Sequence, residues 1–286
     1  MSATVQAPGP VLVGVDGSTR NASAVAWAAA EAASSSAPLV LVHDDGGSGE
    51  AAGRATLERA AAEVARIERQ LRPTIQVLTA HGAAVGLVET AHELERAGRQ
   101  QHSGQSAAGT ATVVVGRRGA GGFRAMNLGS TARRLVHQDG PPTVVVPTGW
   151  DPATVEPSAP VVVDARCVDG EPDTPALAAA MARAHREQRP VVAVSVWSVP
   201  PEQARAGRSI AQVWAEYADR AERELDERLQ PWRTAYPSVK VVAVATDRHP
   251  VAALLDQASG AELLVVPRGV TGCAVVEYAD CPVIVV

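Results

Sequence analysis

Residues 112–131 read TVVVGRRGAGGFRAMNLGST, an apolar run that passes through a glycine-rich connection into a Gly-Ser-Thr sequence. The apolar run predicts a strand over residues 110–116, and the Gly-Ser-Thr sequence predicts a helix over residues 130–137. Glycines let backbone N–H groups approach an anion because no Cβ stands in the way. The N–H groups and the positive dipole end of the helix favour a phosphate at the same place. The connection is therefore predicted to bind phosphate.

The side chains of this connection support the same chemistry. Ser130 or Thr131 could donate a hydroxyl hydrogen bond to a phosphate. Arg117, Arg118 and Arg124 could screen its charge. A glycine-rich turn can also be purely structural, but five glycines, two hydroxyl residues and three arginines on one connection favour a ligand. The spacing is not that of a Walker A loop, which ends in Gly-Lys-Ser/Thr, and no dinucleotide fingerprint follows the first strand.

Across the first half of the chain, on both sides of this connection, short valine-rich runs alternate with longer alanine-rich segments. Strands are predicted at 11–15, 39–43, 75–80, 110–116 and 143–147, and helices at 22–33, 51–71, 85–96 and 130–137. The polar stretch 97–109 is predicted to be an insertion before the fourth strand. Alternation of this kind gives right-handed crossovers and a parallel sheet with helices on both faces, an α/β fold.

The same order of elements then begins again, which indicates an internal duplication. Strands are predicted at 160–164, 191–197, 239–245, 263–267 and 282–286, and helices at 176–187, 210–229 and 251–258. Residues 149–159 lack apolar periodicity and are predicted to be a linker. The predicted domains are therefore 1–148 and 160–286.

The second half lacks the features that favour a ligand in the first. About ten residues are missing between Gly269 and Pro282, where the first half carries its glycine loop. At an offset of 150 residues, Arg166 stands where the first half has Asp16. We therefore expect one nucleotide per chain, bound by the first half.

Asp16 follows the first strand in the sequence VGVDGS at residues 13–18. If the first and fourth strands are neighbours, their carboxyl ends flank the crevice at which doubly wound sheets bind ligands. The Asp16 carboxylate would then lie beside the glycine loop, where it could accept a hydrogen bond from an adenine amino group or a ribose hydroxyl. Its alternative role is to cap the following helix.

These motifs resemble those of the universal stress protein family, over nearly the whole chain. The resemblance is carried by VGVDGS at 13–18, by the pattern G-2x-G-9x-G-S at 116–130 and by VVVP at 144–147. It implies two tandem doubly wound five-stranded parallel sheets of strand order 3-2-1-4-5, each domain pairing through its fifth strand. By position, Gly14 and Asp16 would meet the adenosine and Val42 would line the adenine pocket. The residues that would hold the ribose and phosphates are Gly116, Arg117, Gly119, Gly121, Gly122, Gly129, Ser130 and Thr131.

Composition excludes several other classes of protein. The formal net charge of −5 and the absence of a basic stripe argue against a nucleic-acid binder. No apolar run approaches the roughly 20 residues that span a bilayer, and the first residues do not resemble a signal peptide. Three cysteines without a C-x-x-C spacing favour neither a disulfide framework nor a zinc site. We therefore expect a cytoplasmic protein with no metal site of its own.

The leading hypothesis is an ATP-binding, nucleotide-dependent stress sensor or adaptor that is not an enzyme, because no catalytic base is identifiable. ATP would bind with or without Mg²⁺, cyclic AMP is the alternative ligand, and the protein partner is unknown. The two domains would pair within one chain, or the chain would form a homodimer through the fifth strands. One alternative is a weak ATP hydrolase in which Asp16, or Asp44 with Asp45, positions water or metal. Another is a dimeric interaction protein that binds no nucleotide.

Overall fold

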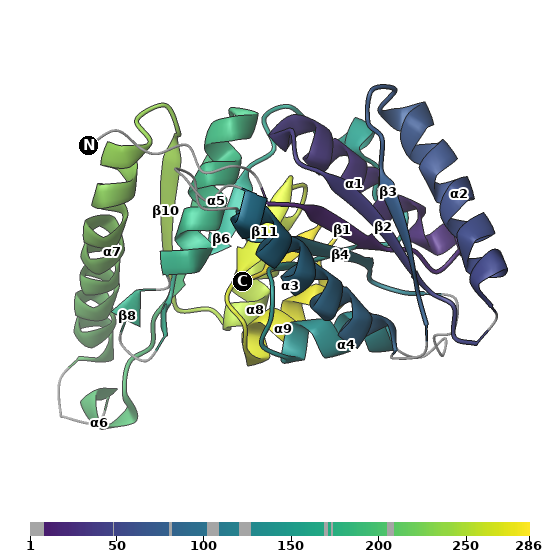
Figure 1. Cartoon of the computed structure of the whole chain (residues 1–286). Coiled ribbons are helices and arrows are strands. Elements are labelled where there is room, and N and C mark those ends of the chain that lie inside the picture. Colours follow the sequence, from purple (N-terminus) through teal and green to yellow (C-terminus); the bar gives the residue numbers. More distant parts are fainter. Residues whose placement is uncertain are drawn as a thin grey trace. The chain divides into compact units, whose positions relative to one another are not determined.

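A computed structural model describes residues 9–47, 49–79, 82–101, 109–119, 127–168, 171–172, 174–204 and 209–286 (Figure 1). The chain forms two compact units, and the boundary between them falls between Thr154 and Val155. In each unit, strands alternate with helices along the chain. Among the described residues, no helix combines the length and the apolar character that crossing a membrane requires.

The first unit is one parallel sheet covered by helices. Its strands are β1 (Val11–Gly14), β2 (Leu39–Asp44), β3 (Thr74–Leu78), β4 (Thr112–Gly116) and β5 (Thr143–Val146). Its helices are α1 (Ala22–Ser35), α2 (Glu50–Ile67), α3 (Ala83–Gln101) and α4 (Ser130–His137), with 3₁₀ turns at Thr19–Asn21 and Pro152–Thr154. The strand order is β5-β4-β1-β2-β3, and each neighbouring pair is parallel.

The second unit repeats this arrangement. Its strands are β6 (Val161–Asp164), β9 (Val191–Val196), β10 (Val241–Thr246), β11 (Leu263–Val266) and β12 (Val283–Val285), in the order β10-β9-β6-β11-β12. Its helices are α5 (Thr174–Glu187), α6 (Pro201–Ala204), α7 (Ile210–Ala235), α8 (Pro250–Ala258) and α9 (Val270–Tyr278). Short strands β7 (Cys167–Val168) and β8 (Glu171–Pro172) form an antiparallel pair. Both units therefore have the predicted order 3-2-1-4-5, and the predicted α/β fold class is confirmed.

Burial on both faces of the sheet explains why the strands are valine-rich. Leu12 and Val13, which are neighbours on β1 and point to opposite faces, are both fully buried. In the first unit α1 packs beside α2, and α3 packs beside α4. The two helix pairs cover opposite faces, so each strand reads as a continuous apolar run and not as an alternating one.

Two helices of the first unit end at different places from those predicted. The predicted helix 51–71 ends at Ile67, and Arg72 precedes Pro73, a position that disfavours helical backbone. By contrast, α3 continues to Gln101, beyond the predicted end at residue 96. The prediction of an insertion at 97–109 was therefore wrong for residues 97–101, whereas residues 102–108 lie outside those described. Glu95 anchors this last part of α3, because its carboxylate accepts a hydrogen bond from the N–H of Ala111 at 2.8 Å.

Helix α9 is absent from the sequence-based prediction. It begins directly after Gly269, whose φ of +139° lies in the region that favours glycine. Gly272 then allows a close approach of the backbone, because a Cβ at this position would lie 2.6 Å from the carbonyl oxygen of Pro267. The second unit has therefore lost the long connection of the first unit but kept a helix between its fourth and fifth strands.

Cys281, just before β12, is predicted to be chemically inert in the folded protein. Burial raises the pKa of its thiol to about 12, so only about one molecule in ten thousand carries the reactive thiolate at pH 8. Iodoacetamide should therefore label Cys281 only after unfolding, and should label the less buried Cys273 faster in the native protein. Peptide mass spectrometry of native and denatured samples measures both rates. Equal labelling of Cys281 in the two samples would contradict this assignment.

Candidate functional site

A cavity of about 300 Å³ opens at the carboxyl ends of the strands of the first unit. It is lined by residues at or just after the ends of β1, β2, β3 and β4, by the 3₁₀ turn before α1, and by the starts of α3 and α4. Because β1 pairs with β4 on one side and with β2 on the other, this is the point at which the direction of winding reverses. Doubly wound sheets bind ligands at this point. We call it the first-unit cavity.

Asp16 reaches the cavity from a tight turn after β1. Its Oδ1 accepts a hydrogen bond from the N–H of Ser18 at 2.9 Å, and Gly17 between them has a φ of +77°. Asp16 thus stabilises the turn that leads into α1. It does not cap a helix, because the N-cap positions are Ser18 for the 3₁₀ turn and Asn21 for α1. It also lines the cavity. The turn holds the carboxylate at a defined position.

Asn21, in the 3₁₀ turn before α1, closes the base of the cavity. Its side-chain N–H donates to the carbonyl oxygen of Gly14 at 3.0 Å, which ties the start of the helix to the end of β1. The residue is only 5% exposed, and its Oδ1 is buried without a hydrogen-bond partner in the described part of the chain. A buried polar atom without a partner costs about 1–3 kcal/mol. A water or a ligand in the cavity is the kind of partner that such an atom needs.

The connection from β4 to α4 is held by backbone hydrogen bonds at both ends. The N–H of Arg117 donates to Val146 on β5 at 2.8 Å, and the carbonyl oxygen of Arg117 accepts from the N–H of Gly129, also at 2.8 Å. Gly129 in turn accepts from Arg133 in the first turn of α4. The start of α4 is therefore fixed against the end of β4, and Ser130 and Thr131 in its first turn line the cavity. Arg118 also lines it, and its guanidinium donates to the side chain of Asn127 at 3.1 Å.

Gly119 brings the two halves of the site together. A Cβ built on Gly119 would lie 2.7 Å from Oδ2 of Asp16, closer than real Cβ atoms approach. A Cβ on Gly129 would lie 3.4 Å from the carbonyl oxygen of Arg117. Glycine at position 119 therefore lets the connection pass directly beside the carboxylate. The prediction that Asp16 lies beside the glycine loop is confirmed as geometry.

The opposite wall of the cavity is apolar. Val42 of β2, Leu78 of β3 and Leu87 of α3 line it, together with Ala83 and Val115. His43 lies beside this wall, and its Nδ1 donates to the carbonyl oxygen of Val15 at 2.6 Å. This hydrogen bond fixes the ring and leaves Nε2 as the other polar atom of the imidazole. An apolar wall with few fixed polar groups is the usual surround of a planar organic ring.

Asp44 and Asp45 mainly shape their own loop. Oδ1 of Asp44 accepts from the N–H of Gly46 at 3.1 Å, and Oδ1 of Asp45 accepts from the N–H of Gly47 at 3.0 Å. Asp44 also lines the cavity. Within the described residues, no group of three or more His, Cys, Asp or Glu side chains is placed to hold a metal ion.

The structure brings together most of the residues that the sequence predicted for the site. The predicted residues that line the first-unit cavity are Gly14, Asp16, Val42, Gly116, Arg118, Gly119, Gly129, Ser130 and Thr131. Arg117 contributes its backbone beside the cavity, whereas Gly121 and Gly122 lie outside the described residues. The polar residues that the prediction missed are Asn21 and His43. His43 directly precedes Asp44 and Asp45, and nothing in the sequence marks Asn21.

The corresponding position in the second unit is occupied by an internal ion pair. Asp164 ends β6, as Gly14 ends β1, and its side chain is 1% exposed. The guanidinium of Arg166 donates to both carboxylate oxygens of Asp164, with distances of 2.6–3.0 Å. These hydrogen bonds raise the pKa of Arg166. The residue that replaces Asp16 therefore turns back onto its own unit.

Sequence comparison places these features among known proteins. The sequence model of the universal stress protein family matches residues 9–147. A universal stress protein of Mycolicibacterium smegmatis is 34% identical over 90% of this chain and 85% of its own length. A universal stress protein of Mycobacterium tuberculosis is 30% identical over 96% of each chain.

Solved structures agree on the fold. A universal stress protein from Archaeoglobus fulgidus superimposes with a TM-score of 0.63, covering 98% of this chain and 97% of its own. A putative universal stress protein from Pseudomonas aeruginosa gives the same TM-score over 98% and 94%. Each is 14% identical in sequence to this chain, so these two likenesses concern the fold alone.

Proposed function

Because this chain belongs to the universal stress protein family, we propose that its first unit binds an adenine nucleotide, with ATP as the preferred ligand. The proposal covers residues 1–148 as the nucleotide-binding domain. Residues 160–286 form a second domain without a nucleotide site. We infer that the bound nucleotide is a signal that a protein partner reads, so that the chain acts as a sensor or adaptor.

The order of chemical groups along the first-unit cavity is the observation that carries this proposal. Val42, Leu78 and Leu87 form an apolar wall that suits a purine ring. The glycine connection and the first turn of α4 suit an anion at the other end. Asp16 follows β1, which lies between β2 and β4 in the sheet, and here a ribose would link the two parts. A nucleotide has the same order of groups: an aromatic ring, a sugar and a phosphate chain.

Adenine is favoured by the acceptors at the site. An adenine amino group is a donor, and the Asp16 carboxylate and His43 Nε2 can accept from it. The alternative is that Asp16 contacts the ribose hydroxyls. Cyclic AMP offers the same adenosine contacts but places less charge against the start of α4. For this reason ATP is the proposed ligand and cyclic AMP the alternative.

The described residues favour binding over turnover. Phosphoryl transfer needs a residue that positions the attacking water and a metal or arginine that neutralises charge. Arg118 lines the cavity and could neutralise charge. For positioning water, Oδ1 of Asp44 is already engaged by the N–H of Gly46. Oδ1 of Asp16, the other acidic residue of the described lining, is likewise engaged, by the N–H of Ser18.

The test is to identify what the purified full chain carries and then to titrate it. We expect native mass spectrometry to show one adenine nucleotide per chain, and calorimetry on the stripped protein to give one site for ATP. Titrations with cyclic AMP and GTP measure the preference for the phosphate chain and for the base. Phosphate release measured beside binding tests for hydrolysis. A stripped protein that binds none of these nucleotides would refute the proposal.

A further inference from the structure

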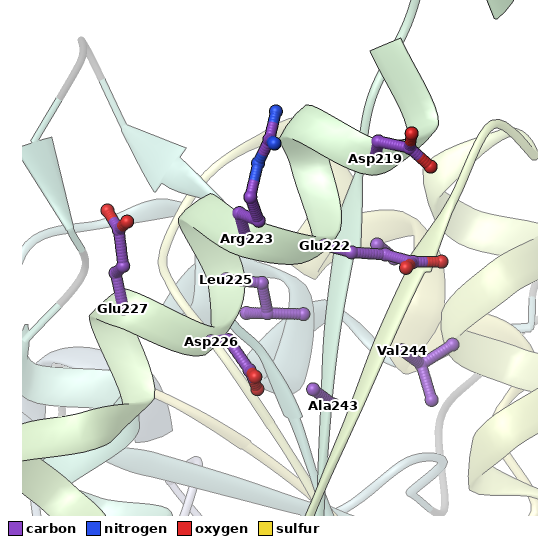
Figure 2. Close-up of a pocket in the computed structure, with 9 residues that line it drawn as sticks. Asp219, Glu222, Arg223, Leu225, Asp226, Glu227, Ala243 and Val244 are labelled. Carbon is purple, nitrogen blue, oxygen red and sulfur yellow. The ribbon is translucent and has the colours of Figure 1, made fainter. Parts of the chain in front are cut away.

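The second unit has a groove that is unrelated to the first-unit cavity. It lies between α7 and β10, has a volume of about 870 Å³ and is open to solvent (Figure 2). Leu225 of α7 and the small residues Ala243 and Ala245 of β10 form its apolar part. We call it the α7–β10 groove. From its charge and its open strand edge, we propose that it binds an extended cationic segment of a partner protein, which adds to β10 as a further strand.

The position of α7 creates the groove. In the first unit, α2 packs on both β2 and β3. In the second unit, the longer α7 lies mainly over β10, the last strand of the sheet order in that unit. The helix therefore forms one wall of the groove, and β10 forms the other.

The edge of β10 is available for a further strand. In the described part of the second unit, β10 has a strand neighbour, β9, on one side only. The carbonyl oxygen of Lys240 accepts from the N–H of Val191 on β9, and that of Thr246 accepts from the N–H of Trp197, the residue after β9. The backbone N–H and C=O groups of the even-numbered residues of β10 therefore face β9. By alternation, the N–H and C=O groups of Val241, Ala243 and Ala245 face away from β9.

The sequence of β10 does not protect this edge. Natural proteins guard an edge strand with charged side chains, prolines or bulges, and VVAVAT at Val241–Thr246 has no charged residue and no proline. Val242 is 39% exposed, an unusual exposure for a strand residue in a valine-rich parallel sheet. An open edge of this kind is the surface to which peptides bind by strand addition.

The charge of the groove selects the partner. Asp219, Glu222, Asp226 and Glu227 line it with a single basic residue, Arg223. Figure 2 shows Glu222 and Asp226 extending from the helix toward the strand, whereas Arg223 and Glu227 point away from it. Asp226 pairs with Arg233 at 2.9 Å. Asp219 and Glu222 have no ion-pair partner among the described residues, so they can pair with lysine or arginine side chains of a bound segment.

The same charges argue against a second copy of this chain as the occupant. If the β10 strands of two chains paired around a twofold axis, the acidic faces of the two α7 helices would lie close to each other. Like charges at an interface oppose association. They also argue against a small organic ligand, because such ligands are enclosed in largely apolar cavities.

The test uses the full chain and a fluorescein-labelled eight-residue peptide that alternates lysine and valine. Fluorescence polarisation should show saturable binding of this peptide and none of a peptide that alternates glutamate and valine. Glu222→Gln should weaken binding by about two- to fivefold, the range for one exposed ion pair. Glu224→Gln is the matched control. It removes the same charge from an exposed residue two positions along α7, about 200° around the helix and outside the groove lining.

The role of the strand edge is tested separately from charge. Ala243→Pro removes an N–H that faces away from β9, which an edge strand tolerates, and should abolish binding of the peptide. A lysine–valine peptide with an N-methyl group on every residue has no N–H donor on either edge, so it tests the same hydrogen bonds on the unmodified protein and should not bind. Equal weakening by Glu222→Gln and Glu224→Gln would overturn the proposal in favour of general attraction between charges. Binding of the N-methylated peptide, absence of binding, or dimerisation of the chain through β10 would each overturn it as well. None of these results depends on whether the first unit binds ATP.

Discussion

Gly119→Ala is expected to lower the affinity for ATP by about 10- to 100-fold, with little change in the stability of the fold. The added methyl group would lie 2.7 Å from Oδ2 of Asp16, so the carboxylate must move out of the position set by its turn. The loss corresponds to about one hydrogen bond to a charged group, which is worth about 1.5–3 kcal/mol.

Gly140→Ala is the matched control for this variant. A Cβ on Gly140 would have as its nearest neighbour a methyl carbon of Val88 at 3.8 Å, an ordinary contact. Calorimetry with ATP should therefore give unchanged binding for Gly140→Ala. If the clash with Asp16 is the cause, Gly119→Ala should cost much less in an Asp16→Ala background, because the two effects share one contact. Wild-type affinity in Gly119→Ala would remove Asp16 and the glycine connection from the proposed site.

The fold could be predicted because its strands and helices differ in length and composition. Continuous valine runs of four to six residues marked the strands, and the restart near residue 160 revealed the second unit. The ends of helices were harder to predict. Nothing local marks the continuation of α3 to Gln101, because the Glu95 carboxylate that anchors it bonds to Ala111, sixteen residues away. Helix α9 was missed because the shortened connection was read as the loss of the whole segment.

The site was predictable where backbone geometry demands a residue type. Gly119 stands where another side chain would meet Asp16, and this requirement is visible in the sequence as the spacing of the glycines. Asn21 and His43 were not predictable in this way. Asn21 matters because it reaches back seven residues to Gly14, and His43 because β2 lies beside β1 and presents the carbonyl oxygen of Val15 to it. Such contacts exist only once the strands are paired.

The two units show how a fold can be kept while a site is lost. Both retain the order 3-2-1-4-5 and a helix before the last strand, because these elements bury the apolar core. In the second unit, the connection after the fourth strand passes directly into α9, so no long glycine loop can surround a phosphate. Asp164 and Arg166 then satisfy each other at the end of β6. This ion pair satisfies the buried Asp164 carboxylate at the position where the first unit has its cavity.

Arg166→Ala is accordingly expected to destabilise the second unit by about 3 kcal/mol, toward the lower end of the range for breaking a buried ion pair. The Asp164 side chain is 1% exposed. After the substitution, the one hydrogen bond left to its carboxylate in the described part of the chain would come from the backbone N–H of residue 166, which lies 3.2 Å from Oδ1. Arg166 itself is 26% exposed, so water can enter the space it leaves and offset part of the cost. Denaturant unfolding of the full chain, followed by circular dichroism, measures the change in the free energy of unfolding.

Two further variants separate the buried pair from a general loss of charge. Arg248→Ala breaks the ion pair between Arg248 and Asp256 in the same unit, but both side chains are at least half exposed, so it should cost less than about 1 kcal/mol. The double variant Asp164→Ala/Arg166→Ala should be more stable than Arg166→Ala alone, because it leaves no buried carboxylate without a partner. If Arg166→Ala and Arg248→Ala had equal small effects, Arg166 would be only a surface cation. The absence of a ligand site in the second unit would then be explained by the missing glycine connection and not by the ion pair.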